Sequence, residues 1–599
     1  METYILSPIL STALSMLLFF GCYELGYNLL RATSLNKIIS QISCLKYQYA
    51  TIGILFLLLI LFPLVSFLDF ASIILKTTGY ILILLGTVCF AKIFLSKRKI
   101  NFFYEDKYIY IFSAFIILYF LLALSPLTAA DVLDYHAGTA LNILRFDNYK
   151  LFPEWFTGLQ AGSGEVLIAL GFAVGSEQFG SLVQFSSILS CSGIIIEFSK
   201  KNKVNFSNFF LAIIIITCPI LIFLLSGNKP QAFFSSLIFL ALAINFIKLK
   251  TENQFILAFF FINILICSAV IGKFSFNLSG FLVWLFTFFN FYKKERLFKL
   301  IMIPIIVFLF IYLPFLFWKF QNLGGNIIDY IFSPFPLHLP GYESFLSHNK
   351  GSQEIPFPFF LFYTTASRIT EFLGFNIVLF LILLLNFKEN KNIKYIIFIS
   401  LIFVAISNIY ASPSARYYLD IILWITLGIT FCKKIKFGIF LKTIFNLQFI
   451  LIFGILIYSN FIFLPGAFLE KNYLEIKNKY AYLYSGFDWI NNSIPKNSNV
   501  IIINRPISQY KEFSVSGGFN YFTNKQEAIY YKNLLKKYNL EYLVYFGNSP
   551  DLFHLENCVE KIFLKKENVG YHATRNPFNK GSSYNGYIFI FNSSKLPDC

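Results

Sequence analysis

Long apolar segments recur along most of this 599-residue chain, and they constrain its fold more than any other feature. Each has about 18 residues or more, which is enough to cross about 30 Å of hydrocarbon as a helix. The segments lack the alternation of a barrel strand, so helices are the structure that satisfies their backbone hydrogen bonds in lipid. Only 13% of the residues are charged, against about 25% in a soluble protein. The chain is therefore predicted to be a polytopic α-helical membrane protein.

The apolar pattern predicts about 14 spans. We expect them at residues 5–22, 48–67, 74–94, 108–126, 179–198, 207–225, 231–249, 254–272, 275–292, 299–318, 372–387, 394–411, 416–432 and 445–464. The first segment has no basic flank and no clear cleavage site, which indicates a retained span rather than a signal peptide.

Basic clusters follow every second predicted span from the third to the thirteenth. The first is Lys97–Lys99 and the last is Lys433–Lys436. All of them fall on the cytoplasmic side if both ends of the chain lie outside, as the positive-inside rule requires. This pattern accounts for the net charge of +18, and without a basic stripe or a binding motif we expect no nucleic-acid partner.

A polar segment, residues 127–165, interrupts the apolar runs after the fourth predicted span. Ionisable groups at a membrane face are costly to bury and usually mark a functional site. On a continuing helix, Asp131 and Asp134 would share one face. Paired carboxylates there could act as a general base, or they could hold a divalent cation as a cofactor. The alternative is that both cap a helix and solvate the end of a loop.

Two neighbouring features of this segment also carry alternatives. His136 could orient an acceptor or an aspartate, or it could satisfy a backbone group of the loop. Residues 162–176 are apolar but short, so they are expected to form an interfacial or re-entrant helix on the outer face, with Glu165 as a cap. Trp155 is expected to be an ordinary interfacial aromatic residue.

The sequence Asp131-Val-Leu-Asp-Tyr-His136, placed after a span and a turn, resembles the first outer loop of the GT-C glycosyltransferases. Within that superfamily it is most similar to the family 39, protein-mannosyltransferase-like group, whose pattern is an Asp, often Asp-Glu, followed by Tyr-His. The match implies that Asp131 is the catalytic base. Val132 departs from the pattern, because it stands where the family usually has Glu, and Asp134 is a candidate substitute.

Two further short motifs support the resemblance. Arg416-Tyr417 opens a late span and is similar to the Arg-Tyr at the outer mouth of these enzymes, and Lys273 in GKFS resembles a Lys-aromatic-Ser pattern. With Lys229 in GNKPQ, these cations lie at the outer ends of predicted spans, where they could hold a phosphate and stabilise its departure. The alternative for each is a basic side chain that snorkels at a helix end.

The resemblance implies an inverting hexosyl- or pentosyltransferase of the bacterial inner or plasma membrane. Its donor would be a polyprenyl-phosphate sugar, and its acceptor a hydroxyl of a lipid, glycan or protein on the outer face. The implied catalytic residues are Asp131, Asp134 and His136, and the implied substrate-binding residues are Arg416, Lys273, Lys229, Tyr135 and Tyr417. No metal ligand is assigned.

Three regions are predicted along the chain. Residues 1–100 add transmembrane helices, residues 101–465 form the catalytic core with outer loops at 127–178 and 319–371, and residues 466–599 form a small extracytoplasmic α/β domain. In the last region we expect helices at 479–492 and 525–538 and strands at 500–503, 540–546 and 587–591.

Some residues of the outer regions have open roles. Cys558 and Cys599 could pair if the last domain lies outside. The second loop could line the acceptor side, or its polar side chains could simply be solvated; its candidates are His338, Glu343, His348, Glu354 and Arg368.

Two other functions fit a polytopic protein of this size. A lipid-linked glycan flippase or transporter would carry ionisable groups in mid-span and inverted repeats, and no convincing repeat is present. An O-antigen-type polymerase or ligase would use a large outer loop, for which residues 319–371 are long enough and Arg368 is available.

Overall fold

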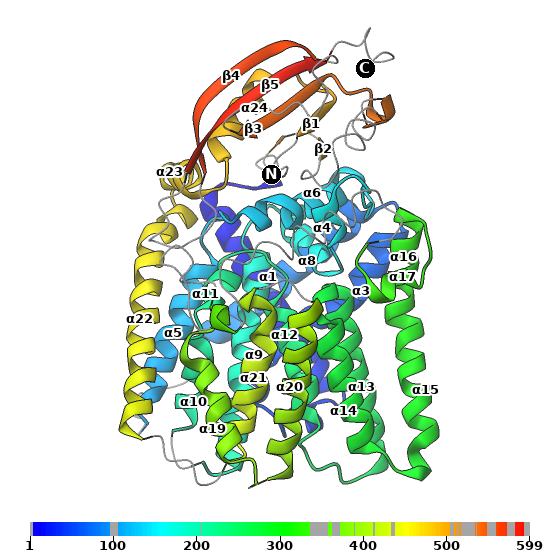
Figure 1. Cartoon of the computed structure of the whole chain (residues 1–599), viewed down its shortest axis with the longest axis vertical. Helices are drawn as coiled ribbons and strands as arrows, with labels where there is room; N and C mark the ends of the chain where they lie inside the picture. Colours follow the sequence, from blue (N-terminus) through cyan, green and yellow to red (C-terminus); the bar gives the residue numbers. More distant parts are fainter. Residues whose placement is uncertain are drawn as a thin grey trace.

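A computed structural model describes most of the chain. The described residues are 4–95, 106–204, 207–335, 358–361, 372–388, 390–410, 414–432, 438–502, 508, 510–511, 514–516, 533–534, 536–547, 559–571 and 582–591. In this part of the chain a tall helical bundle carries a small domain on one end (Figure 1). We call this end the domain end.

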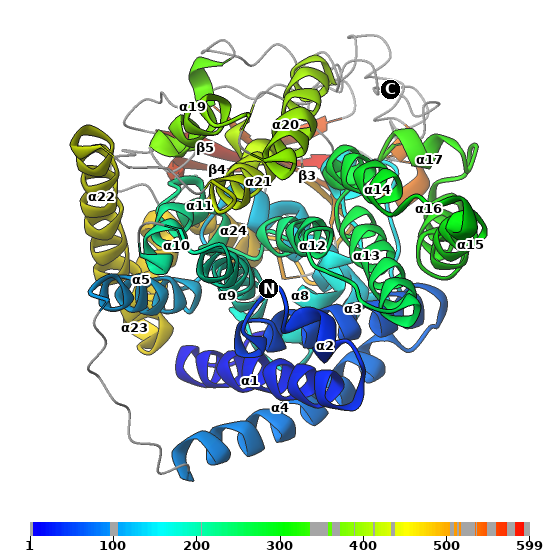
Figure 2. The ribbon, with the colours of Figure 1, turned by 90° about the horizontal axis from the view of Figure 1, so that it is seen from below.

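The bundle consists of helices that run between its two ends, with shorter helices at the domain end (Figures 1 and 2). The helices of the bundle are α1 (Pro8–Ala32), α3 (Tyr49–Phe67), α4 (Ala71–Leu95), α5 (Tyr108–Ala123), α9 (Phe179–Lys201), α10 (Asn208–Ile216), α11 (Ile220–Leu225), α12 (Ala232–Ile244), α13 (Glu252–Gly272), α14 (Asn277–Phe291), α15 (Leu297–Val307), α16 (Leu313–Leu323), α19 (Val378–Leu385), α20 (Lys391–Tyr410), α21 (Leu419–Ile429) and α22 (Ile439–Phe463). The shorter helices at the domain end are α6 (Ala137–Arg145), α7 (Phe156–Leu159), α8 (Gly164–Ala173) and α17 (Asp329–Phe332). The short helix α2 (Asn36–Ile39) lies at the opposite end, between α1 and α3 (Figure 2).

Every segment that was predicted to span contains helix, which confirms the polytopic helical fold. Among the described residues, 9 helices are long and apolar enough to cross a membrane, so the predicted count of about 14 is not confirmed. Several of the others are short; α12, for example, has 13 residues. One segment is broken between α10 and α11, where Pro219 lacks the N–H that a continuous helix needs.

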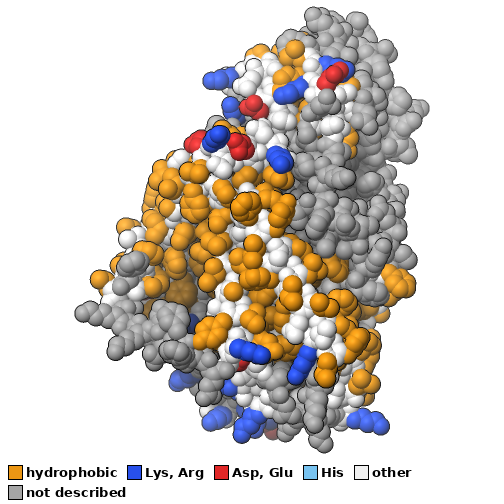
Figure 3. Space-filling view, turned by 90° about the vertical axis from the view of Figure 1, so that its left-hand side faces the viewer, with side chains coloured by type: hydrophobic (Ala, Val, Ile, Leu, Met, Phe, Trp, Pro, Cys, Tyr) orange, Lys and Arg blue, Asp and Glu red, His pale blue; other side chains and the backbone are white. Residues whose placement is uncertain are grey.

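The surface of the bundle is apolar between two charged ends. Figure 3 shows hydrophobic side chains over the middle of one face, with Lys and Arg at the end opposite the domain. On α22, Ile450 and Phe461 are 70% and 79% exposed, as expected for side chains that face lipid. The basic residues Lys200 and Lys201 end α9, and Lys391 begins α20, at that opposite end.

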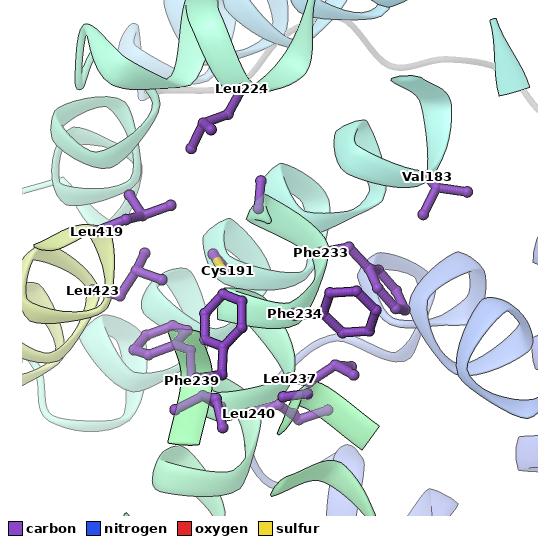
Figure 4. Packing of buried hydrophobic residues seen from close by; sticks show 14 of the residues in the cluster. Val183, Cys191, Leu224, Phe233, Phe234, Leu237, Phe239, Leu240, Leu419 and Leu423 are labelled. Carbon is purple, nitrogen blue, oxygen red and sulfur yellow. The ribbon is translucent and has the colours of Figure 1, made fainter. Parts of the chain in front are cut away.

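The centre of the bundle is closely packed. Figure 4 shows Phe233, Phe234 and Leu237 of α12 near Cys191 of α9, with Leu419 and Leu423 of α21 beside them. All thirteen residues of α12 are buried. This core holds the ends of α12 and α21 in fixed positions, and these ends carry site residues.

The first three long helices pack as a unit through glycines. A Cβ on Gly26 of α1 would lie 1.8 Å from the carbonyl oxygen of Tyr49, and one on Gly53 of α3 would lie 1.9 Å from that of Cys22. Only glycine permits so close an approach of two helix backbones in a membrane. The N-terminal segment is therefore an integral helix of the bundle.

The small domain is α/β, as predicted. It contains α23 (Glu470–Tyr480), α24 (Tyr484–Ser493), β1 (Val500–Ile502), β2 (Val515–Ser516), β3 (Tyr542–Gly547), β4 (Val559–Tyr571) and β5 (Ser582–Phe591). The sheet order is β2-β1-β3-β5-β4. β1 pairs in parallel with β2 and β3, and β5 pairs antiparallel with β3 and β4.

Several details of this domain differ from the sequence prediction. The helix predicted at 479–492 begins later, as α24 at Tyr484, because Leu483 before it adopts a left-handed backbone with φ of 54°. The helix α23, which ends at Tyr480, was not predicted. Strand β4 was not predicted. Most of the helix predicted at 525–538 lies outside the described residues, as do Cys558 and Cys599.

Candidate functional site

A single π-helical turn follows α5 and carries the polar motif. It covers Val132–His136, with Asp131 as the residue that precedes it, and α6 continues from it. A π turn holds more residues than an α turn and is frequent at functional sites. Asp131, Asp134 and His136 consequently contact different parts of the protein. The expected face shared by Asp131 and Asp134 assumed an α-helical spacing that the chain does not adopt here.

Asp131 lies between two cations. Its Oδ2 accepts a hydrogen bond from Nζ of Lys229 and another, of 3.0 Å, from a terminal nitrogen of Arg416. The Lys229 side chain is 1% exposed, whereas Asp131 and Arg416 are each 22% exposed. The carboxylate is therefore held by a buried cation and remains partly exposed.

The cations come from the ends of helices that the fold brings together. Lys229 lies between α11 and α12, Lys273 caps α13, and Arg416 lies in a short 3-10 turn (Ala415–Tyr418) before α21. Consecutive crossings of the bundle place these helix ends at the domain end, where α5 also ends (Figure 1). Their common sidedness was predictable from the span count, but their convergence on Asp131 was not.

Gln231 connects the cations and was not predicted from the sequence. Its side-chain oxygen accepts a 3.3 Å hydrogen bond from Lys273, and its nitrogen donates to the backbone oxygen of Arg416 at 2.8 Å. Its own backbone N–H donates to the side chain of Gln184 at 3.1 Å. The guanidinium of Arg416 also donates to the Tyr417 hydroxyl at 3.3 Å. These bonds hold Lys273 and Arg416 in position.

His136 forms a buried pair with Glu165, which begins α8. Nδ1 of His136 lies 2.7 Å from Oε1 of Glu165, and both side chains are 1% exposed. The other oxygen of Glu165 accepts from the backbone N–H of Gly162 at 2.8 Å. Nε2 of His136 is buried without a hydrogen-bond partner. Glu165 thus orients the histidine, whereas the sequence had suggested only a helix cap.

Burial sets the protonation of this pair. It lowers the pKa of His136 well below its ordinary value, and the nearby cations Lys273 and Lys229 act in the same direction. Burial raises the pKa of Glu165 to about 7, against the opposing effects of hydrogen bonds from the Gly162 and Glu165 backbones and of Lys273 and Lys319. A neutral imidazole that donates from Nδ1 leaves Nε2 as an acceptor.

Asp134 and Tyr135 are both buried. Asp134 accepts a 3.1 Å hydrogen bond from the hydroxyl of Thr157 on α7. The Tyr135 ring lies 4.0 Å from that of His136, between centroids, and belongs to an apolar cluster that also contains Trp155 and residues of the small domain. Trp155 is thus buried under that domain instead of lying at an interface.

The small domain covers the polar loop through specific contacts. Arg145 donates to the backbone oxygen of Tyr510 at 3.0 Å, and the Ser508 hydroxyl donates to the backbone oxygen of Leu133. In the apolar cluster, Leu483 and Phe487 of the domain are 1% exposed. We call this set of contacts the loop cover.

The donor set does not fit a divalent cation. Asp131 is surrounded by Lys229, Arg416 and Lys273, so a metal ion there would face three positive charges. Among the residues that the structure describes, no group of three or more His, Cys, Asp or Glu side chains comes together. An anion suits this site better, because the cations outnumber the carboxylates.

Two further predictions concern the helix near residues 162–176 and the second outer loop. Residues 164–173 form a helix, but every residue of it is buried between other elements, so it is not an interfacial helix exposed to lipid. The second-loop candidates lie outside the described residues: His338, Glu343, His348, Glu354 and Arg368.

The helical bundle with its first loop under a small domain defines a membrane protein of the GT-C fold. The structure of ArnT from Cupriavidus metallidurans bound to undecaprenyl phosphate matches with a TM-score of 0.51 at 9% identity, over 82% of this chain and 99% of that chain. Apo ArnT from the same organism gives a TM-score of 0.49 at 9% identity, over 82% and 98% of the two chains. At 9% identity the likeness to the undecaprenyl-phosphate-bound ArnT structure establishes the fold alone, and it confirms the predicted GT-C fold.

The chain belongs to the DUF1420 family, because the DUF1420 N-terminal domain matches residues 87–473. A third structure, the oligosaccharyltransferase AglB from Archaeoglobus fulgidus in complex with an inhibitory peptide and a dolichol-phosphate, gives a TM-score of 0.40 at 13% identity, over 74% of this chain and 70% of that chain. A comparison with curated protein sequences finds no significant match.

Proposed function

We propose that this protein is an integral-membrane glycosyltransferase that moves a sugar from a polyprenyl-phosphate donor to an acceptor hydroxyl. The observation that carries the proposal is the position of the partly exposed Asp131 carboxylate between Lys229 and Arg416. A carboxylate beside a cluster of cations offers a base and a phosphate site side by side. The complex of ArnT with undecaprenyl phosphate supports this choice of donor by analogy of fold.

In this mechanism, the donor phosphate competes with Asp131 for its two cations. Binding of the phosphate to Arg416 and Lys229 weakens their hold on the carboxylate and makes it a better base. Asp131 then takes the proton of the acceptor hydroxyl while the acceptor oxygen attacks the anomeric carbon. The bond from that carbon to the phosphate oxygen breaks, and the phosphate leaves with the electron pair and is stabilised by the cations. A single displacement of this kind inverts the anomeric configuration.

His136 would orient the acceptor near Asp131. Its Nε2 is buried and unpartnered, while Nδ1 is fixed by Glu165. An acceptor hydroxyl that donates to Nε2 would satisfy the orphaned nitrogen. Lys273, held by Gln231, would add to the positive field around the departing phosphate.

The sugar transfer can be tested by comparing cells with and without the gene. Loss of the gene should remove one sugar from an envelope glycan and leave the corresponding polyprenyl-phosphate sugar to accumulate. Mass spectrometry of the lipid-linked pool and of the surface glycans measures both changes. Unchanged pools and glycans would contradict the proposal, and accumulation of a complete lipid-linked glycan on the inner leaflet would indicate a flippase.

The orientation is also a proposal and has its own test. The basic helix ends lie opposite the small domain, which supports an extracytoplasmic site and domain by the positive-inside rule. A phosphatase reporter fused within the small domain should be active, and a cytoplasmic fluorescent reporter there should not be. A fluorescent, phosphatase-inactive domain would place the site in the cytoplasm.

Transfer should depend on pH through Glu165. Above pH about 7 the carboxylate of Glu165 is ionised and accepts from Nδ1 of His136. Below that pH it is protonated and can donate to Nδ1, which leaves the hydrogen on Nε2. Activity should therefore rise as pH increases through about 7. In Glu165→Gln this step should disappear from the pH profile; a step that persists there would assign the titration to another group.

A further inference from the structure

Lys477 and Glu177 form a buried ion pair that the proposed reaction does not use. Nζ of Lys477, on α23 of the small domain, lies 2.6 Å from Oε1 of Glu177, and the two side chains are 1% and 0% exposed. Glu177 lies in the bundle, just before α9. The pair therefore joins the small domain to the bundle through buried charges.

Both members of the pair also bind the segment that leads to Asp131. Lys477 donates a 2.8 Å hydrogen bond to the backbone oxygen of Leu127, which is itself fully buried. The backbone N–H of Leu127 donates to Oε1 of Glu177 at 3.2 Å. Leu127 follows α5 and comes shortly before Asp131 in the chain. The ion pair thereby fixes the backbone just before the proposed base.

The backbone of Glu177 holds the loop that carries Lys229. Its carbonyl oxygen accepts a 3.0 Å hydrogen bond from the side chain of Asn228, whose own oxygen accepts from the Ser181 hydroxyl at 3.0 Å. Asn228 is 1% exposed and directly precedes Lys229. Through its side chain and its backbone, Glu177 consequently contacts both of the segments that meet where Asp131 pairs with Lys229.

The two segments also touch each other directly. A Cβ on Gly227 would lie 2.8 Å from a methyl carbon of Val132, so only glycine lets the Lys229 loop approach the π turn this closely. This contact limits how near Asp131 and Lys229 can come to each other. The hydrogen bonds made by Glu177 oppose their separation, so the spacing between base and cation is constrained in both directions.

The buried pair is not arranged for stability alone. Among the residues that the structure describes, Oε2 of Glu177 is buried without a hydrogen-bond partner, and an unsatisfied oxygen of a buried carboxylate costs free energy. Apolar side chains of similar size often replace a buried ion pair without loss of stability, whereas in some proteins the pair specifies one geometry. Both features favour a role in fixing the geometry of the neighbouring segments.

We propose that Glu177 and Lys477 are positioning residues of the transfer reaction, which hold Asp131 at the distance from Lys229 that catalysis needs. The inference rests on the proposed function, in which Asp131 is the base and Lys229 helps to bind the donor phosphate. The pair acts through the two segments that it binds and does not touch the reacting atoms. Lys477 makes the geometry of the site depend on the docked small domain.

The first test measures sugar transfer by the full chain with Lys477→Met. The donor is the polyprenyl-phosphate sugar extracted from cells that lack the gene, and the membranes of those cells supply the acceptor. Methionine keeps the length of the side chain but makes neither hydrogen bond. Misplacement of a catalytic group by about 1 Å can cost about 10²-fold in rate, so kcat should fall by up to about that factor. The donor KM should not change, because the bond between Glu177 and Asn228 remains.

A double variant separates positioning from a general loss of stability. Lys477→Met alone leaves the buried carboxylate of Glu177 without its counter-charge, which should lower the unfolding temperature. In Glu177→Gln/Lys477→Met no charge remains unpaired, so the unfolding temperature should recover toward that of the parent chain. Transfer should stay low in both variants, since neither restores the hydrogen bond from the small domain to Leu127. Recovery of transfer together with stability would overturn the positioning role.

The matched control for these variants is Lys471→Met. Lys471 is an exposed lysine on the same helix, α23. Its replacement removes a charge of the same kind from the small domain without touching the buried pair, so kcat and the donor KM should both stay at the values of the parent chain. An equal fall of kcat in Lys471→Met and Lys477→Met would overturn the role of the buried pair.

Chemical labelling of Asp131 tests the geometry without the transfer reaction. A carbodiimide modifies carboxyl groups, and the cations that hold Asp131 should protect it. Mass spectrometry should show faster modification of Asp131 in both Lys477 variants than in the parent chain and in Lys471→Met. Equal rates in all four chains would overturn the positioning role. A parent chain that transfers no sugar would contradict the proposed function, and faster labelling in the Lys477 variants would then still support the positioning of Asp131.

Discussion

Replacing Asp131 with Asn should abolish sugar transfer while leaving folded protein in the membrane. The amide keeps the shape of the carboxylate but cannot take the proton of the acceptor hydroxyl. General-base catalysis is typically worth about 10²–10⁴-fold in rate, so transfer should fall by roughly that factor. The measurement is complementation of a gene deletion, scored by the envelope glycan, together with the rate of transfer in isolated membranes.

The control for this substitution is Asp488→Asn. Asp488 is an exposed acidic residue on α24 in the small domain, and it lies outside the cluster of cations. It should retain the transfer rate of the parent chain. Normal transfer by Asp131→Asn would contradict the assignment of the base. The substitution also removes the negative charge that pairs with Lys229 and Arg416.

Replacing Arg416 with Gln should cause the second large loss. The guanidinium contacts Asp131 and is positioned by Tyr417 and by the bond between its backbone and Gln231. Removing one preorganised donor to a developing charge typically costs about 10²–10³-fold in rate. Arg416→Lys should recover part of the loss, because it restores the charge without the planar, two-pronged geometry.

The kinetic constants of Arg416 variants distinguish a role in donor binding from a purely structural role. A donor site predicts that Arg416→Gln raises the KM for the lipid-linked donor and lowers kcat, with the KM for the acceptor unchanged. Tyr417→Phe, which removes only the hydroxyl that accepts from Arg416, should have a much smaller effect. A variant of Arg416 that changes only protein abundance would contradict a role in donor binding.

The sequence predicted the membrane architecture because hydropathy is a local property. The hydropathy of a segment indicates a membrane helix whatever elements pack against it in the fold. The lengths of the helices were harder to predict. Pro219 breaks one predicted span into two helices, and several helices, such as α12, are too short to count as spans by length alone. The α/β character of the last domain was also predictable, but β4, whose pairing with β5 contains register shifts, was not.

The candidate site was predictable in its residues and less so in its geometry. Asp131, Lys229 and Arg416 were each recognisable as ionisable groups at helix ends, and the fold brings them into contact. Glu165 was assigned a smaller role because its partner His136 is distant in sequence and a π turn has no simple periodicity.

The loop cover has a consequence for the timing of assembly. Tyr135 and Trp155 are synthesised long before the strands that bury them. During synthesis the bundle can insert and pack while its first loop still lacks the contacts of Ser508 and Tyr510. The site therefore matures only when the last domain has folded onto it, and a nascent chain already embedded in the membrane would stay inactive until that late step.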